Sequence, residues 1–206
     1  PMFLRTFINK YPKVNLIIKE QSTESIIKNI RDGHLDAASA ATPLEIEYLV
    51  ERPLYYEPFV GYIPQDHRLR DIKELTVADL EVSDILLLQD GHCFRDGVLN
   101  LCKAPKKLGE EHFKLQSGSF ETLVNLSNEG LGMTLLPYLN SMELNTANKK
   151  NITYFKEPSP AREVSILYHK NELKIQITEA LKDVITSVVK GAITFQDVKI
   201  ISPLGN

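Results

Sequence analysis

The chain has 206 residues, which is enough for one large domain or two small ones with a substantial core. Its 24 Lys and Arg residues against 27 Asp and Glu residues give a formal net charge of −3 without a dense basic cluster, so this stretch is not expected to bind nucleic acid by itself. No apolar run reaches the roughly 18 residues that a membrane span needs, and two cysteines do not make a disulfide scaffold.

The first part of the chain alternates helical and extended patterns. In chain order the sequence predicts a helix at 1–9, a strand at 14–18, a helix from 22–23 to 33, a strand at 35–41 and a long extended segment at 54–63. This order predicts a parallel sheet whose ligand cleft lies beyond the carboxyl ends of its strands. Ser22 and Thr23 lie at such an end, so each is either a helix cap or a cleft residue.

The remaining elements continue the alternation. The sequence predicts a buried strand at 84–88, a helix from 93, a charged turn-like segment at 104–111, a strand at 112–116, a helix at 119–128, strands at 133–136, 152–155 and 164–168, and a long helix at 174–189. The tail at 195–206 has no assignable pattern. Alternating elements with two long extended connections predict two α/β subdomains joined by crossing strands.

Both cysteines lie in the segment where a strand pattern changes to a helical one. Helical spacing begins at about Cys93. Because the first N–H groups of a helix lack partners and its dipole is positive there, a thiolate is favoured over a thiol. His92 and Arg95 flank this position and are expected to add positive charge. Cys93 is therefore a candidate nucleophile.

Cys102 follows nine residues later, which in a continuous helix is a rise of about 13.5 Å on nearly the opposite face. A disulfide usually needs Cα atoms within about 4.4–6.8 Å, so bonding the two sulfurs requires the helix between them to come apart. The alternative interpretation is two buried, unreactive cysteines, because this spacing is neither a zinc nor a thioredoxin signature. The histidines are scattered singly, so we expect neither a metal nor another cofactor.

The stretch from Leu88 to Cys102 resembles the redox segment of peroxide-sensing members of the LysR-type transcriptional regulators, with both cysteines at the family's spacing. The resemblance also covers residues 11–13, 30–36, 53–58, 119–123 and 130–137. It implies an α/β fold of two Rossmann-like subdomains joined by two crossover strands, as in the LysR effector domain and in type 2 periplasmic binding proteins.

The same resemblance implies a domain division. The first subdomain would comprise residues 1–56 and 164–206, and the second, residues 57–163, would carry the redox cysteines. The DNA-binding helix-turn-helix of the family, and the first strand of its effector domain, are expected to lie outside this chain.

The resemblance further implies a mechanism. Hydrogen peroxide would oxidise Cys93 to a sulfenic acid, which would condense with Cys102 and remodel the domain and its homodimer or tetramer to control oxidative-stress genes. His92 and Arg95 are candidates to steady the peroxide and protonate the leaving hydroxide. The candidate binding residues are Ser22, Thr23, Thr134 and Arg162.

Plainer roles compete with two of these residues. A solvated surface arginine is an equal interpretation of Arg162, and a strand hydroxyl satisfied by backbone is the favoured interpretation of Thr134. DNA would be contacted only through the missing domain, with RNA polymerase as a further partner of the full-length protein. No membrane association is expected, and the predicted location is the cytoplasm.

Two alternative functions belong to different classes. One is a LysR-type effector domain that binds a small organic ligand between its subdomains, with incidental cysteines. The other is a thiol peroxidase, which is disfavoured because peroxidase motifs are not found around Cys93. We therefore expect a regulatory domain and not an enzyme.

Overall fold

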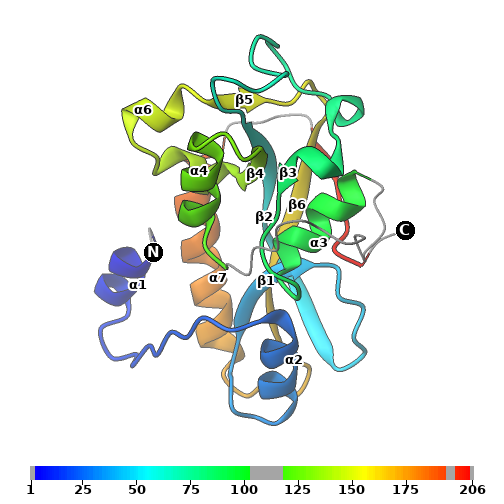
Figure 1. Cartoon of the computed structure of the whole chain (residues 1–206). Coiled ribbons are helices and arrows are strands. Elements are labelled where there is room, and N and C mark those ends of the chain that lie inside the picture. The colour runs from blue at the N-terminus through cyan, green and yellow to red at the C-terminus, as the bar shows by residue number, and fades with distance from the viewer. Residues whose placement is uncertain (1–2, 103–117, 194–197, 205–206) are drawn as a thin grey trace. The chain divides into compact units, whose positions relative to one another are not determined.

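The computed structural model describes residues 3–102, 118–193 and 198–204. The chain forms two compact units, unit 1 with residues 1–55 and 163–194 and unit 2 with residues 56–162 and 195–206. Both contain helices and strands (Figure 1), which confirms the predicted α/β class. The segments predicted at 104–111 and 112–116 lie outside the described residues.

Two long strands contribute residues to both units, as predicted for crossover strands. They are β2 (Leu49–Tyr62) and β6 (Ser159–His169). Each is buried through much of its length, and β2 is buried continuously over its last six residues. This burial fits a strand that runs through the interior and not along an edge.

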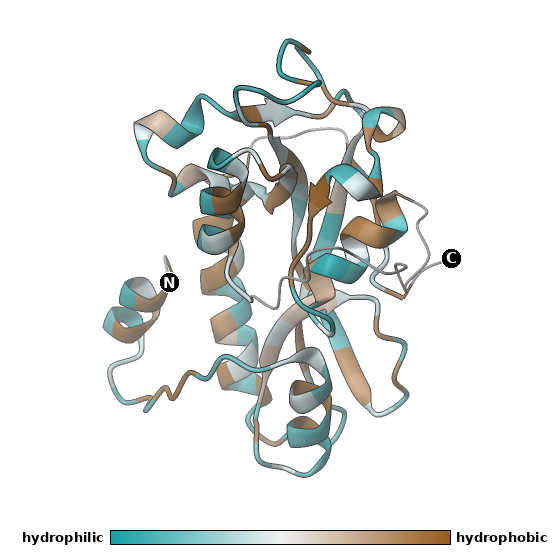
Figure 2. Cartoon of the chain, in the orientation of Figure 1, coloured by the Kyte–Doolittle hydropathy of each residue, from teal (hydrophilic) through white to brown (hydrophobic). Residues whose placement is uncertain are grey.

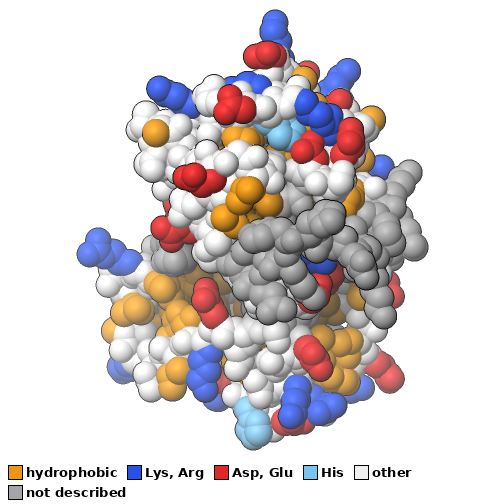
Figure 3. Space-filling model, viewed as in Figure 1, with side chains coloured by type: hydrophobic (Ala, Val, Ile, Leu, Met, Phe, Trp, Pro, Cys, Tyr) orange, Lys and Arg blue, Asp and Glu red, His pale blue; other side chains and the backbone are white. Residues whose placement is uncertain are grey.

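The described residues of unit 1 form three helices and the strand β1, together with one end each of β2 and β6. The elements are α1 (Leu4–Lys10), α2 (Thr23–Arg31), β1 (Ala38–Thr42) and α7 (Ile175–Lys190). β1 pairs antiparallel with β6, with Ala38 opposite Leu167 and Thr42 opposite Glu163. The prediction of parallel strands is therefore wrong for the pair of β1 and β6. Hydrophobic side chains gather on the surface over α1 and α7 (Figure 3).

The strand predicted at residues 14–18 is not formed. Ile17 and Ile18 are 71% and 57% exposed, and no strand among the described residues pairs with them. A β-branched sequence favours extended backbone, but a strand requires a neighbour to satisfy its N–H and C=O groups. Residues 14–18 are therefore unpaired chain in this structure and not a strand.

Unit 2 is built on the end of β2 and the shorter strands around it. The strands are β3 (Ile85–Leu86), β4 (Met133–Pro137), β5 (Ile152–Tyr154) and β7 (Val198–Ile200), and the α-helices are α3 (Cys93–Leu101), α4 (Phe120–Asn128), α5 (Tyr138–Met142) and α6 (Thr146–Lys149). β4 pairs antiparallel with β2 and parallel with β3. Helix α3 follows β3 in the chain and therefore begins beyond the carboxyl end of that strand (Figure 1).

The core of unit 2 joins α3 to the sheet. β3 is hydrophobic (Figure 2), and the cluster includes Phe59, Leu88, Phe94, Val98 and Leu101, each at most 4% exposed. Burial of these side chains is the main source of stability for α3, because an isolated helix of nine residues is too short to be stable in water.

The C-terminal tail packs on unit 2. β7 runs parallel to the start of β6, the N–H of Ile201 donates to the carbonyl of Ala161 at 2.7 Å, and Nδ2 of Asn100 donates to the carbonyl of Ser202 at 2.8 Å. The described part of the tail, residues 198–204, therefore groups with unit 2, whereas the sequence analysis placed it with the first subdomain.

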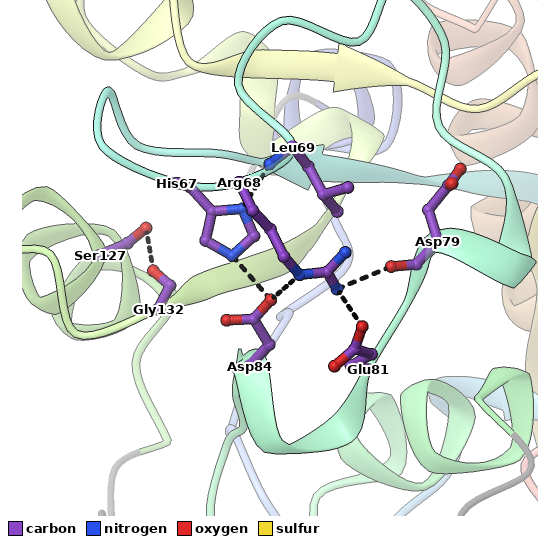
Figure 4. A network of polar contacts seen from close by, with 8 residues as sticks. All are labelled: His67, Arg68, Leu69, Asp79, Glu81, Asp84, Ser127 and Gly132. Atoms are coloured by element: carbon purple, nitrogen blue, oxygen red, sulfur yellow. Dashed lines mark hydrogen bonds and ion pairs between the residues drawn. The ribbon is translucent and has the colours of Figure 1, made fainter.

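A polar network holds the residue that precedes β3 (Figure 4). Oδ2 of Asp84 accepts from Nε of Arg68 at 2.8 Å and lies 3.0 Å from Nε2 of His67. Arg68 also donates to the carbonyl of Asp79 at 2.9 Å and lies 3.2 Å from the carboxylate of Glu81. These contacts fix the backbone of Asp84 in place.

Gly132 lies against this fixed backbone. Its φ is +143°, its carbonyl accepts from Oγ of Ser127 at 2.8 Å, and a Cβ at this position would lie 2.8 Å from the carbonyl oxygen of Asp84. Gly130, two residues earlier, also has positive φ (+79°) but would place its Cβ in open space. Both glycines thus have positive φ, but Gly132 lies farther from the left-handed region that other residues can adopt and is also the one whose Cβ would meet backbone.

Gly132→Ala is expected to lower the free energy of unfolding by about 3 kcal/mol or more, since the new methyl group meets backbone that cannot yield. Gly130→Ala is the matched control and should cost about 1 kcal/mol, the penalty of positive φ alone. Denaturant unfolding of both variants measures the difference, and equal losses would contradict the steric explanation.

Among the described residues, no helix has the length and apolar character needed to cross a membrane.

Candidate redox site

Helix α3 begins at Cys93, as predicted from the sequence. His92 is its N-cap, with extended backbone and with Nδ1 accepting the N–H of Phe94 at 3.2 Å. Cys93 is the first helical residue, is half-buried and carries a free thiol. Its sulfur therefore lies in the turn where backbone N–H groups and the helix dipole favour negative charge.

Three aromatic rings and the imidazole of His92 surround this turn, and we call them the aromatic cluster. The ring of Phe94 lies 5.0 Å from those of Phe59 and Phe120, and the imidazole lies 6.0 Å from Phe120 in an edge contact. The residues before and after Cys93 are thus both packed in the cluster, which fixes the backbone that carries the thiol.

Gly97 allows α3 to approach β2 closely. A Cβ at Gly97 would lie 3.3 Å from Cζ of Phe59, tighter than ordinary contact. Glycine here has a normal helical conformation, so its role is the close approach and not an unusual φ.

Arg162 supplies positive charge beside the aromatic cluster. Its guanidinium carbon lies 5.2 Å from the ring centroid of Phe94, in cation–π geometry. Its Nη2 and Nε donate to Oε2 of Glu57 at 2.7 and 3.0 Å. The side chain of Arg162 is only 19% exposed, so it is not a solvated surface arginine.

His92 is a neutral imidazole at pH 7. Burial lowers its pKa, and the positive charge of Arg162 lowers it further. Because Nδ1 accepts the N–H of Phe94, the remaining proton is on Nε2. Burial among apolar rings beside a cation thus disfavours the positive charge expected for His92, and its role in the redox site stays a prediction.

Arg95 is engaged with the turn that precedes α3. It lies 3.0 Å from the carboxylate of Asp90 and donates to the carbonyl of Leu88 at 3.2 Å. Its charge is thus shared with a carboxylate that is largely exposed. Arg95 is close to Cys93 in the sequence. In the structure its guanidinium holds the segment between β3 and α3 in place through its contacts with Leu88 and Asp90.

Cys102 caps the other end of α3. Its N–H donates to the carbonyl of Val98 at 3.0 Å, and burial raises the pKa of its thiol to about 11. It is therefore protonated at neutral pH, and both cysteines are free. Nine residues of helical rise, about 13.5 Å, separate its backbone from that of Cys93.

The remaining predicted residues have structural partners. Thr134 is buried, and its hydroxyl donates to the carbonyl of Leu86 at 2.9 Å, which joins β4 to β3. Oγ of Ser22 accepts the N–H of Ser25 at 3.3 Å as the N-cap of α2, and Thr23 opens that helix. Ser22 and Thr23 belong to unit 1, whereas Cys93 belongs to unit 2. A ligand role for these three residues stays a prediction.

Glu57 and the aromatic residues were missed by the sequence analysis. Glu57 is 2% exposed, and a carboxylate directly before the apolar end of β2 was the signal that could have found it. The partner that explains it, Arg162, lies 105 residues away in the chain, beyond the reach of local patterns.

Among the described residues, no group of three or more His, Cys, Asp or Glu side chains could hold a metal ion.

Residues 1–190 match the family of LysR substrate binding domains, so the chain belongs to that family. Over 199 residues it is 31% identical to a protein named a probable hydrogen peroxide-inducible genes activator from Streptomyces viridosporus. This alignment covers 92% of this chain and 64% of that protein. The chain thus spans less than two thirds of that relative's length.

Solved structures of OxyR share the fold. OxyR from Porphyromonas gingivalis superposes with a TM-score of 0.82 at 26% identity, over 97% of this chain and 93% of that one. The reduced form of the OxyR regulatory domain from Pseudomonas aeruginosa gives a TM-score of 0.80 at 27% identity, over 96% and 91% of the two chains. The fold described above is therefore that of a LysR effector domain, as the sequence predicted.

The N-cap role of His92 predicts a pH-dependent stability. Because folding lowers its pKa, protonation favours the unfolded chain, so its stabilisation is complete above the unfolded pKa of about 6.5 and is lost as the pH falls towards the lower folded value. His92→Asn keeps a capping side chain but cannot titrate. Denaturant unfolding at pH 7.5 and pH 5 should show a larger loss in wild type than in His92→Asn. The same loss in both would contradict the assignment.

Proposed function

We propose that this chain is the peroxide-sensing regulatory domain of a LysR-type transcription factor, with Cys93 as the sensing thiol and Cys102 as the resolving thiol. The observation that carries the proposal is the asymmetry of the two cysteines across one helix. Cys93 occupies the N-terminal turn of α3, next to Phe94, whose ring contacts the guanidinium of Arg162, whereas Cys102 caps the opposite end as a thiol whose pKa is raised to about 11. The relative named a probable hydrogen peroxide-inducible genes activator supports the same function.

The first step is attack of the Cys93 thiolate on one peroxide oxygen. An S–O bond forms, the O–O bond breaks, and hydroxide leaves and takes a proton from solvent, so that the products are a sulfenic acid and water. The neutral His92 offers an N–H for a hydrogen bond to the peroxide. As a neutral imidazole it is not the acid that protonates the hydroxide. The positive charge of Arg162 favours the anionic groups of this step.

The second step joins the two sulfurs. The Cys102 sulfur attacks the sulfenic sulfur, a disulfide forms and a second water leaves, so that two thiols are oxidised as one peroxide is reduced to two waters. Burial keeps Cys102 unreactive while α3 is intact, so α3 must open first. Opening exposes Phe94, Val98 and Leu101, and the two states therefore differ in core packing as well as in covalent bonding.

In the full-length regulator this change would act on other parts of the protein. We propose that it alters a homodimer or tetramer formed through this domain, and through that assembly a DNA-binding domain outside this chain and contact with RNA polymerase. The proposed location is the cytoplasm, where reducing thiols would reset the switch. Nothing in this scheme requires catalytic turnover.

The direct test is intact mass and free-thiol count before and after one equivalent of hydrogen peroxide. Wild type should lose two hydrogens and both thiols, with Cys93 linked to Cys102 in the peptide map. Cys102→Ser should stop at a sulfenic acid that a dione reagent traps on Cys93, and Cys93→Ser should keep its remaining thiol. Unchanged wild-type protein would refute the proposal and favour a domain that binds a small organic ligand.

The raised pKa of Cys102 predicts unequal alkylation in the folded, reduced protein. At pH 7.5 a thiol of pKa about 11 has roughly 100-fold less thiolate than one at the ordinary value of 9.0. Iodoacetamide should therefore label Cys93 at least tenfold faster than Cys102, and the two rates should converge in denaturant. Equal rates in the folded protein would contradict the buried, protonated state of Cys102.

A further inference from the structure

Glu57 is a buried carboxylate on the strand that supports the redox helix. It is 2% exposed, and it begins the continuously buried end of β2. Its neighbour two residues along, Phe59, is in the aromatic cluster. A carboxylate is retained in such a place only when its oxygens are paired, because transfer of a charge out of water is costly.

Both oxygens of Glu57 have partners. Oε2 accepts two N–H groups of Arg162, at 2.7 and 3.0 Å, and Oε1 accepts the backbone N–H of Leu139 at 3.1 Å in the first turn of α5. The backbone of α5 therefore fixes the carboxylate through Oε1, and Oε2 in turn holds the guanidinium of Arg162. Two N–H bonds to one oxygen fix the plane of the guanidinium as well as its distance.

The guanidinium held in this way contacts Phe94 and acts electrostatically on His92, the residues on either side of Cys93. It lies over the ring of Phe94 at 5.2 Å, and its charge contributes to the lowered pKa of His92. Glu57 is thus linked to the redox segment through the side chain of Arg162.

We propose that Glu57 is a positioning residue for the redox site, and that its carboxylate sets where the positive charge of Arg162 stands relative to Cys93. The inference deepens the proposed function and rests on it, since the charge matters to the anionic groups of peroxide reduction. Without Glu57, the ring of Phe94 would be a weaker and less directional anchor for a flexible side chain.

The test compares Glu57→Gln with wild type, using Glu74→Gln as the control. Glutamine keeps the shape of the side chain and a carbonyl for the N–H of Leu139, but not the charge that grips Arg162. Glu74 is exposed and lies in the same unit, so its variant removes one negative charge without touching the site. Arg162→Gln provides the reference in which the cation is absent.

The first readout is the pKa of His92, followed by NMR in the reduced protein. Arg162→Gln should raise it towards the ordinary value, because one of the two causes of its lowering is gone. Glu57→Gln should raise it in the same direction as Arg162 moves away, and Glu74→Gln should not. If the pKa of His92 in Glu57→Gln stays at or falls below the wild-type value, Arg162 is in place without Glu57 and the inference is overturned.

The second readout is the rate of Cys93 oxidation by peroxide. We expect Glu57→Gln and Arg162→Gln each to slow it by about tenfold or more, with little further loss in the double variant because both changes remove one interaction. Independent, multiplying losses would overturn the inference. A wild-type protein that does not react with peroxide would refute the proposed function, while the titration of His92 would still decide whether Glu57 positions Arg162.

Glu57→Asp covers the outcome in which the glutamine variant does not fold. It keeps the buried ion pair but withdraws the carboxylate by one methylene group, which draws Arg162 away from Phe94. A raised pKa of His92 together with slower oxidation would support the inference, and wild-type values of both would overturn it.

Discussion

The packing of Phe94 between Phe59 and Phe120 is the contact on which the redox segment depends. It buries the first turn of α3 against β2 and α4, and so fixes the helix start that carries Cys93. The same packing keeps Cys102 at the far end of a continuous helix. A helix of nine residues has little stability of its own, so α3 is stabilised mainly by its packing against the core of unit 2.

Each arginine at this site is paired with a carboxylate, so none acts there as an isolated cation. His92 is neutral because it is buried beside Arg162, and Arg95 is tied to Asp90. The largely buried cation, Arg162, is paired with the buried carboxylate of Glu57 at 2.7 Å, which offsets the cost of removing its charge from water. Proximity in sequence pointed to His92 and Arg95, whereas burial and long-range pairing select Arg162.

Local signals predicted the helix start at Cys93, the caps at Ser22 and the two crossover strands, because each depends on residues within one turn or one strand. What they missed is non-local. The antiparallel pairing of β1 with β6, the unpaired backbone at residues 14–18 and the docking of the tail on β6 are decided by partners distant in sequence. The Glu57–Arg162 pair, which holds the buried cation of the site, joins residues 105 positions apart. In the sequence, the only sign of this pair is a carboxylate beside apolar residues of β2.

Gly97 gives the separating helix a weak point at its centre. Glycine costs a helix roughly 1 kcal/mol relative to alanine, and here it is retained where a methyl group would press on Phe59. Close packing and low helix propensity are therefore joined in one residue. Under the proposed function, this glycine eases the unwinding of α3 that must precede closure of the disulfide, and the helix must form again before the protein returns to its resting form.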